Sequence, residues 1–222
     1  MLAKDLLSEI IPAIKTSDTG IDALNMMELF KVSHLPIVNN KEFLGLISDK
    51  DIYDLNLADE SIGNHGLSLI RPFVYSHQHF FEIIDIVTNM KLTLVPVLNA
   101  KNNEYIGVIT LTELVHSFAN FTSVDQHGGI IVLELNQNDY FLSQITQIVE
   151  GNDAKILSLY ITSPAESTKL ELTIKLNVSD LAGIIQTFNR YNYNIKETFS
   201  HDDIEDTLFK NRYESFLNYL NI

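Results

Sequence analysis

The sequence predicts an α+β protein with two domains, and three observations support this fold class. The first half of the 222-residue chain contains a repeat of about sixty residues, each copy reading helix, strand, turn, strand, helix. The second half reads strand, helix, strand, strand, helix, strand. A polar segment that ends in two glycines, 122–129, lies between them. We expect domains at 1–122 and 129–222, with the copies at about 1–60 and 61–122.

The repeat is visible in matching prolines and glycines. Pro36 and Pro96 are sixty residues apart, and Gly45 and Gly107 are sixty-two apart. Apolar residues at helical spacing precede each proline and predict one apolar helix face per copy: Ile21, Leu24, Met27 and Leu29, then Phe80, Ile83, Ile84, Ile86 and Val87. "LPIV" and "VPVL" predict a first strand, and "FLGLIS" and "YIGVIT" predict a second. The hydroxyl residue that ends each second strand then predicts the N-cap of the next helix.

The residues after the second strand of the first copy suit a nucleotide. Gly45 allows close approach to the backbone, Ser48 offers a hydroxyl at a helix start, and Asp51 places a carboxylate one turn further on. A carboxylate can accept hydrogen bonds from both ribose hydroxyls, while a helix N-terminus favours phosphate. The same Ser-x-x-Asp pattern is also an ordinary capping arrangement, so binding requires Asp51 to face an intramolecular groove.

The pattern apolar-Pro-apolar-apolar, a turn, then Gly-apolar-apolar-Ser/Thr-x-x-Asp resembles the CBS domain. The tandem copies, over roughly residues 1–120, are similar to a CBS pair. The resemblance implies that Ser48 and Asp51 hold phosphate and ribose, with Leu35 and Pro36 beside the base. It also implies that the residue two before the proline, His34, faces the phosphate.

The second copy matches the same pattern less closely. Thr110 and Pro96 keep their places, but Glu113 replaces the aspartate and Leu94 replaces the histidine. "TLTE" also reads as a capping box, in which a threonine and a glutamate satisfy backbone amides at a helix start. We therefore expect the first copy to be the better site.

Charge narrows the choice of ligand. A net charge of −14 and a pI near 4.7 disfavour nucleic acid as a partner. The cations that can be argued near the motifs are Lys50, Arg71 and a partly protonated His34. We expect a monophosphate, a nucleoside or S-adenosylmethionine rather than a triphosphate. The ligand would be regulatory, and no cofactor is expected to be obligatory.

Other features exclude several classes of protein. The chain has no cysteine, its start does not read as a signal peptide, and no stretch approaches the roughly 18 apolar residues of a membrane span. We expect a cytoplasmic protein without membrane contact. His77, His79 and Glu82 could form part of a metal site, but they match no metal motif. No catalytic fingerprint is present, so we expect neither a metal site nor an enzyme.

The second half predicts a ferredoxin-like βαββαβ domain. It resembles the ACT regulatory domain, with 180–183 opening the second helix and Ser179 as its expected N-cap. Segment 135–142 lacks the glycine of ACT domains that bind amino acids, so dimerisation or signal transmission is an equal alternative. Acidic residues followed by apolar residues at helical spacing predict a C-terminal amphipathic helix at 202–222. The combined order is similar to that of bacterial acetoin-utilisation accessory proteins.

These features predict a non-catalytic ligand sensor that transmits binding of an adenine-type ligand to its second domain or to an unknown protein target. The alternative is an assembly module with empty clefts. A homodimer is expected in either case. Met26, Met27 and Phe30 could form part of its interface, or could equally belong to the core.

Overall fold

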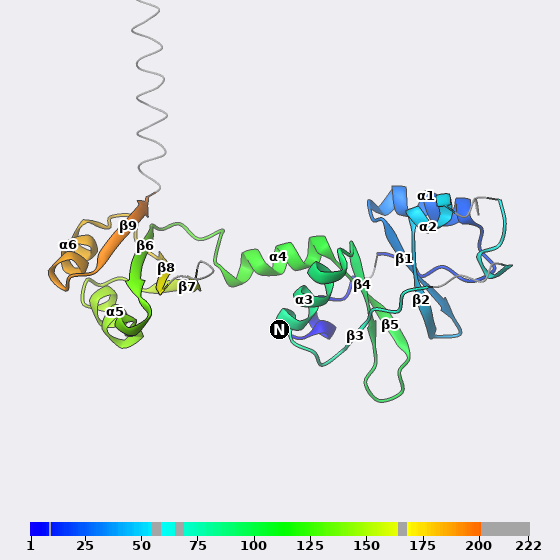
Figure 1. The fold of residues 1–222 in the computed structure, drawn as a ribbon, viewed down its shortest axis with the longest axis horizontal. Helices are drawn as coiled ribbons and strands as arrows, with labels where there is room; N and C mark the ends of the chain where they lie inside the picture. The colour runs from blue at the N-terminus through cyan, green and yellow to red at the C-terminus, as the bar shows by residue number, and fades with distance from the viewer. Residues whose placement is uncertain (9, 55–58, 65–68, 164–167, 201–222) are drawn as a thin grey trace, which may run out of the picture. The chain divides into compact units, whose positions relative to one another are not determined.

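The structure is a computed structural model, and it describes residues 1–8, 10–54, 59–64, 69–163 and 168–200. The chain divides into two compact units, Met1–Ser117 and Phe118–Ile222 (Figure 1). Both units contain helices and strands, which confirms the mixed α+β class. The narrower domain limits proposed from the sequence, 1–122 and 129–222, stay a prediction.

The first unit contains the repeat in the expected order of elements. The first copy comprises α1 (Gly20–Phe30), β1 (His34–Asn39), β2 (Glu42–Ser48) and α2 (Asp49–Asp54). The second comprises β3 (Val74–Tyr75), α3 (Phe80–Met90), β4 (Leu94–Leu98), β5 (Tyr105–Thr110) and α4 (Leu111–Phe121). Short 3-10 helices lie at Ala3–Leu6 and Ile62–Asn64. In each copy the two strands around the proline and the glycine pair antiparallel, and β3 adds a parallel pairing to β4.

The apolar face predicted for the first helix is partly wrong. Helix α1 buries Gly20, Ala23 and Met27, whereas Ile21 and Leu29 are exposed. Two residues correspond to about 200° of rotation around a helix, so Leu29 cannot share the face of Met27. The prediction for α3 is better, because its Phe80, Ile83 and Val87 are buried.

The chain segment ahead of each copy forms a hydrogen bond with a strand of the other copy. Ser8, which lies ahead of the first copy, donates its backbone N–H to the carbonyl of Val108 in β5 at 2.8 Å. In the reciprocal contact, Leu46 in β2 donates to the carbonyl of Ile70, ahead of the second copy, at 2.9 Å. A hydrophobic cluster also contains buried residues of both copies: Phe43, Leu46, Leu92, Leu94, Leu98 and Val108. The copies therefore fold as one unit with approximate two-fold symmetry.

The second unit has the predicted order βαββαβ. Its elements are β6 (Ile130–Asn136), α5 (Leu142–Glu150), β7 (Ile156–Thr162), β8 (Lys169–Leu176), α6 (Ala182–Arg190) and β9 (Asn194–Phe199), with a 3-10 turn at Gln137–Asp139. The four strands form one antiparallel sheet in the order β7-β8-β6-β9, which is the ferredoxin-like arrangement. Alternate residues of β6 and β8 join α5 and α6 in one core.

The start of α6 differs from the prediction. The N-cap is Leu181, whose side chain makes no capping bond, and not Ser179. Leu181 is instead buried in the core, and Asp180 accepts the N–H of Ala182 at 3.0 Å. Core packing of a leucine therefore decides where this helix begins. The predicted helix at 202–222 lies outside the described residues. Within the described residues, no helix is both long and apolar enough to cross a membrane.

Candidate functional site

The motif of the first copy forms a capping box at the start of α2. Asp51 accepts from the backbone N–H and from the hydroxyl of Ser48, at 2.9 and 2.7 Å on the same oxygen, Oδ2. Ser48 Oγ accepts the backbone N–H of Asp51 at 3.1 Å. The side chain of Asp51 is exposed, and a cavity of about 330 Å³ is lined in part by Asp49, which lies between Ser48 and Asp51. The geometry thus shows the capping role of this motif, and contact of Asp51 with a sugar stays a prediction.

The neighbours of this motif are used for packing. Leu35 and Pro36 are buried, and Leu35 belongs to the core of the first copy. Gly45 has φ +156°, and a Cβ placed there would lie 2.6 Å from Cβ of Leu69 and 3.0 Å from the carbonyl oxygen of Ile70. The close approach that we expected a ligand to make at Gly45 is therefore made by the chain itself.

His34 lies at the contact between the two copies. Its Nδ1 is 3.1 Å from Oγ1 of Thr93, and the same hydroxyl oxygen accepts the backbone N–H of Ser33 at 3.0 Å. Burial lowers the pKa of His34, and the carboxylates of Asp49 and Asp51 oppose this shift. Thr93 Oγ1 already accepts one hydrogen bond, so its own hydroxyl proton is best donated to Nδ1 of a neutral His34.

We expect His34 to make the fold less stable in mild acid. Below its ordinary pKa of 6.5 the unfolded chain takes up a proton at this residue while the folded chain resists it, so the free energy of unfolding falls as pH decreases. Urea unfolding at pH 7.5 and 5.5 should show that the free energy of unfolding decreases less for His34→Gln than for the unchanged protein. His116→Gln, which changes an exposed histidine, serves as the control. If the free energy of unfolding decreased equally for His34→Gln and His116→Gln, His34 would not be the source of the pH dependence.

The motif of the second copy also forms a hydrogen-bonded pair at a helix start. Thr110 Oγ1 donates to Oε2 of Glu113 at 2.5 Å and accepts the backbone N–H of Glu113 at 3.1 Å. Thr110 is 7% exposed, and Glu113 is half-buried. Pro96, in contrast, is buried within β4. The Thr110–Glu113 pair is thus more enclosed than the Ser48–Asp51 pair.

A cleft of about 530 Å³ lies beside this second motif. It forms because the hydrogen bond from Ser8 to Val108 brings the N-terminal segment of the chain alongside the end of β5. The lining includes apolar side chains of Ile10, Ile11, Phe30, Val32, Leu111 and Val115. Its polar and charged side chains are Ser8, Lys31, Thr93, Thr110, Thr112, Glu113 and His116. A cleft of this size with an apolar wall and a few polar groups is typical of a small-molecule site.

Comparison with known proteins identifies the first unit. The family model of the CBS domain matches residues 3–57 and 70–120, which are the two copies of the repeat. The first half of the chain is a tandem pair of CBS domains. The resemblance seen in the sequence is therefore confirmed for this half. Proteins with CBS domains are often regulatory nucleotide sensors, and the matched structures include complexes with AMP and with ATP.

Three solved structures illustrate the similarity. A CBS domain pair/ACT domain protein from Thermotoga maritima is 20% identical, with 53% of this chain and 96% of that chain covered and a TM-score of 0.47. CBSX2 in complex with AMP is 19% identical over 56% of this chain and 98% of that one, with a TM-score of 0.47. A putative acetoin utilization protein from Vibrio cholerae is 20% identical over 56% of this chain and 95% of that one, also with a TM-score of 0.47.

Several residues of the cleft in the CBS pair were not expected from the sequence. Lys31 and His116 supply the basic side chains, and Thr93 contributes its hydroxyl. Helical spacing could have suggested His116, since it lies three residues after Glu113 in α4 and shares its face. Lys31 carried no such signal, because it reaches the cleft only through the packing of the first copy against the second.

The other side chains considered from the sequence have different roles. His79 is the N-cap of α3, where its Nδ1 accepts the N–H of Phe81 at 3.3 Å, and Glu82 accepts the N–H of His79 at 2.9 Å. Arg71 donates to the carbonyl of Phe43 at 2.7 Å, and Lys50 is exposed. None of these residues lines the cleft beside Thr110.

Proposed function

We propose that this protein is a non-catalytic regulatory sensor of an adenine-type ligand, and that its main site is the cleft beside Thr110 and Glu113. The observation that carries the proposal is the composition of this cleft, in which an apolar wall meets a carboxylate and two basic side chains, Lys31 and His116. Each part suits one portion of a nucleotide. The proposal differs from the sequence-based expectation in placing the main site at the second copy.

The adenine would pack against the apolar wall. Ile10, Ile11, Val32 and Val115 all line the cleft, and an aromatic base removes apolar surface from water when it packs on such side chains. Ile10 is 72% exposed and Val115 is 61% exposed in the protein without ligand. A bound base would cover both residues, and their burial would favour binding.

The ribose and the phosphate would use the polar end of the cleft. The Glu113 carboxylate accepts from the Thr110 hydroxyl through one oxygen, which leaves acceptor positions for sugar hydroxyls. The positive end of the α4 dipole lies at the same place and favours a phosphate. Lys31 is within reach, and its present ion pair with Glu28 joins two highly exposed side chains and stabilises little.

The charges of the cleft favour a ligand with few phosphates. Lys31 and His116 are the basic side chains of the cleft, while Glu113 supplies a negative charge. AMP, adenosine and S-adenosylmethionine are therefore the preferred candidates, and ATP is disfavoured. Ser48, Asp51 and His34 would form a weaker second site at the first copy.

We propose that binding changes how the two CBS copies pack and that the ferredoxin-like unit or a partner protein responds. The βαββαβ order and the sheet order of that unit support an ACT-like domain. A homodimer remains part of the proposal, although Met27 is 4% exposed and belongs to the core, so it is not available for an interface. The competing proposal is an assembly module whose clefts stay empty.

A titration of the full chain with AMP, adenosine, S-adenosylmethionine and ATP tests this function. We expect saturable binding of at least one of the first three, measured by isothermal titration calorimetry and as a rise in the melting temperature. Absence of binding across the panel would support the assembly module.

A variant of the first copy separates the two candidate sites. Asp51→Ala should leave the tighter AMP-binding event unchanged and weaken the second, weaker event by about 10- to 100-fold, the range for losing hydrogen bonds to a charged group. If Asp51→Ala instead weakened the tighter event, the main site would lie at the first copy.

A further inference from the structure

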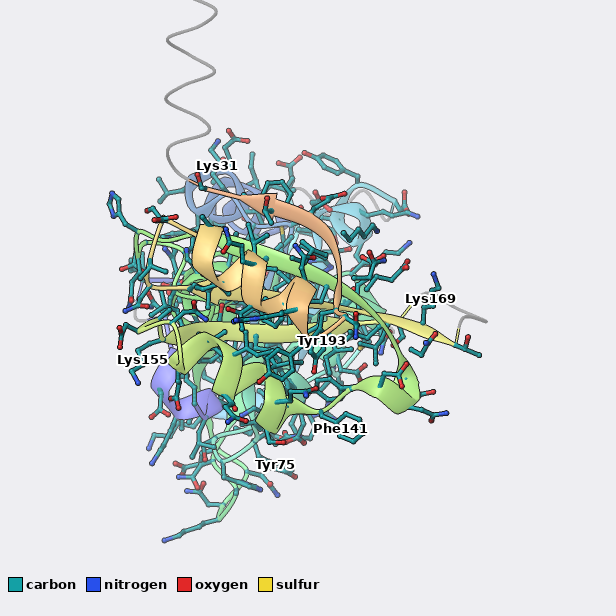
Figure 2. The ribbon with its side chains drawn as sticks, turned by 90° about the vertical axis from the view of Figure 1, so that its left-hand side faces the viewer. Lys31, Tyr75, Phe141, Lys155, Lys169 and Tyr193 are labelled. Carbon is teal, nitrogen blue, oxygen red and sulfur yellow. The ribbon has the colours of Figure 1, made fainter. Side chains whose placement is uncertain are left out.

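The second unit contains a cleft of about 470 Å³ that the proposed nucleotide site does not explain. It lies at one end of the sheet, between the end of β6, the segment leading into α5, and the turn from α6 to β9. Figure 2 faces this unit and shows Phe141, Lys169 and Tyr193, which come from three different segments and all line the cleft. The other lining residues are Glu134, Leu135, Asn136, Asp139, Gln144, Tyr191, Asn192 and Asn194.

The charges in this cleft do not cancel. Glu134 accepts from Nζ of Lys169 at 2.6 Å and from Nδ2 of Asn194 at 3.1 Å, and the ammonium of Lys169 lowers the pKa of Glu134. Asp139 accepts from an amide, Nδ2 of Asn136, at 2.8 Å. No ion pair found in the described part of the chain includes Asp139. The lining therefore carries one net negative charge, at Asp139.

Three aromatic side chains, Phe141, Tyr191 and Tyr193, line the same cleft as Asp139. Phe141 is 58% exposed and Tyr191 is 50% exposed, although both are large side chains that line the cleft. Tyr193 is held in place, because its hydroxyl donates to Oε1 of Gln144 at 2.7 Å and its ring packs edge-on against Phe188. Burial raises the pKa of Tyr193, and the charge of Asp139 adds to this shift.

We propose that this cleft binds a small organic cation with an ammonium head, held by the Asp139 carboxylate and by the faces of Phe141 and Tyr191. Ring faces attract ammonium groups, and quaternary ammonium ligands are bound in proteins by such groups of aromatic side chains. The volume of the cleft is within the range of small-molecule sites. The net charge of −14 of the chain also raises the concentration of cations near its surface. The site lies in the second unit and is independent of the proposed nucleotide site.

The test uses choline and its neutral carbon analogue 3,3-dimethylbutan-1-ol, which have the same shape and differ in charge. NMR titration of the full chain with choline should shift the amide signals of residues 139–144 and 191–194 in a saturable way. The neutral analogue, and sodium chloride at the same ionic strength, should not produce these shifts. If the analogue binds as tightly as choline, the cleft is an apolar site and the proposal is wrong.

Two variants and a matched control complete the test. Asp139→Asn keeps an oxygen that can accept from Asn136, and Tyr191→Leu keeps an apolar side chain without a ring face. Each should weaken choline binding by about three- to tenfold, as expected for one charged or ring contact. Asp153→Asn removes the same charge from an exposed position of the same unit, outside the cleft, and should leave binding unchanged. Equal affinities for Asp139→Asn and Asp153→Asn would overturn the proposal.

Discussion

Glu113→Ala is expected to weaken AMP binding by about 10- to 100-fold. The carboxylate of Glu113 is the group in the cleft that can accept hydrogen bonds from both ribose hydroxyls, and hydrogen bonds to a charged group contribute about 1.5–3 kcal/mol. Isothermal titration calorimetry of the full chain measures the change directly. Adenine itself, which lacks the ribose, should bind the variant and the unchanged protein equally.

The capping role of Glu113 requires two controls. Glu113→Gln keeps an oxygen that can accept from Thr110 and should lose about tenfold in AMP affinity with little change in stability. Glu82→Ala removes the corresponding acid of the α3 capping box, which lies outside the cleft, and should lower the melting temperature without changing AMP affinity. If Glu82→Ala weakened AMP binding as much as Glu113→Ala, the effect would reflect lost stability and not lost ribose contacts.

Gly128→Ala is expected to destabilise the ferredoxin-like unit by about 3 kcal/mol. Gly128 has φ +152°, and a Cβ at this position would lie 1.8 Å from the carbonyl oxygen of Leu176 in β8. Backbone strain and overpacking each cost about 1–3 kcal/mol. Hydrogen exchange measured by mass spectrometry should become roughly 100-fold faster in peptides covering β6 and β8. Unchanged hydrogen exchange in β4 of the first unit would show that the destabilisation is confined to the second unit.

Gly183→Ala is the matched comparison for this substitution. Gly183 lies within α6, and a Cβ there would meet only the side-chain oxygen of Asn152, at 3.0 Å. A side chain can move aside, whereas the backbone carbonyl of Leu176 is held in the sheet, so Gly183→Ala should cost far less. Similar acceleration of exchange in both variants would show that the contact with Leu176 is not the cause.

Local patterns predicted much of the fold. The spacing of Pro36 and Pro96 revealed the repeat, and the second half was predicted in its correct order of strands and helices. The predictions failed at Leu29, where the helical period was misapplied, and at Ser179, where packing of the next residues outweighs a local signal. Leu29 was assigned to the buried face of α1 but lies about 200° from Met27 and is exposed, and Ser179 suits an N-cap but precedes a buried leucine that takes this position. Propensities of single residues do not include such contacts.

The sequence by itself determined the two halves, the order of their elements, the CBS motifs and the hydrogen-bonded pairs at the helix starts, because these depend on neighbours only a few residues apart. The tertiary structure decided which distant segments line the cleft beside the second motif. Contacts between Ser8 and Val108, a hundred residues apart, bring Ile10 and Ile11 next to Thr110 and Glu113, and packing of the copies adds Lys31. A site assembled from distant segments depends on the shape of the folded core, which no local pattern contains.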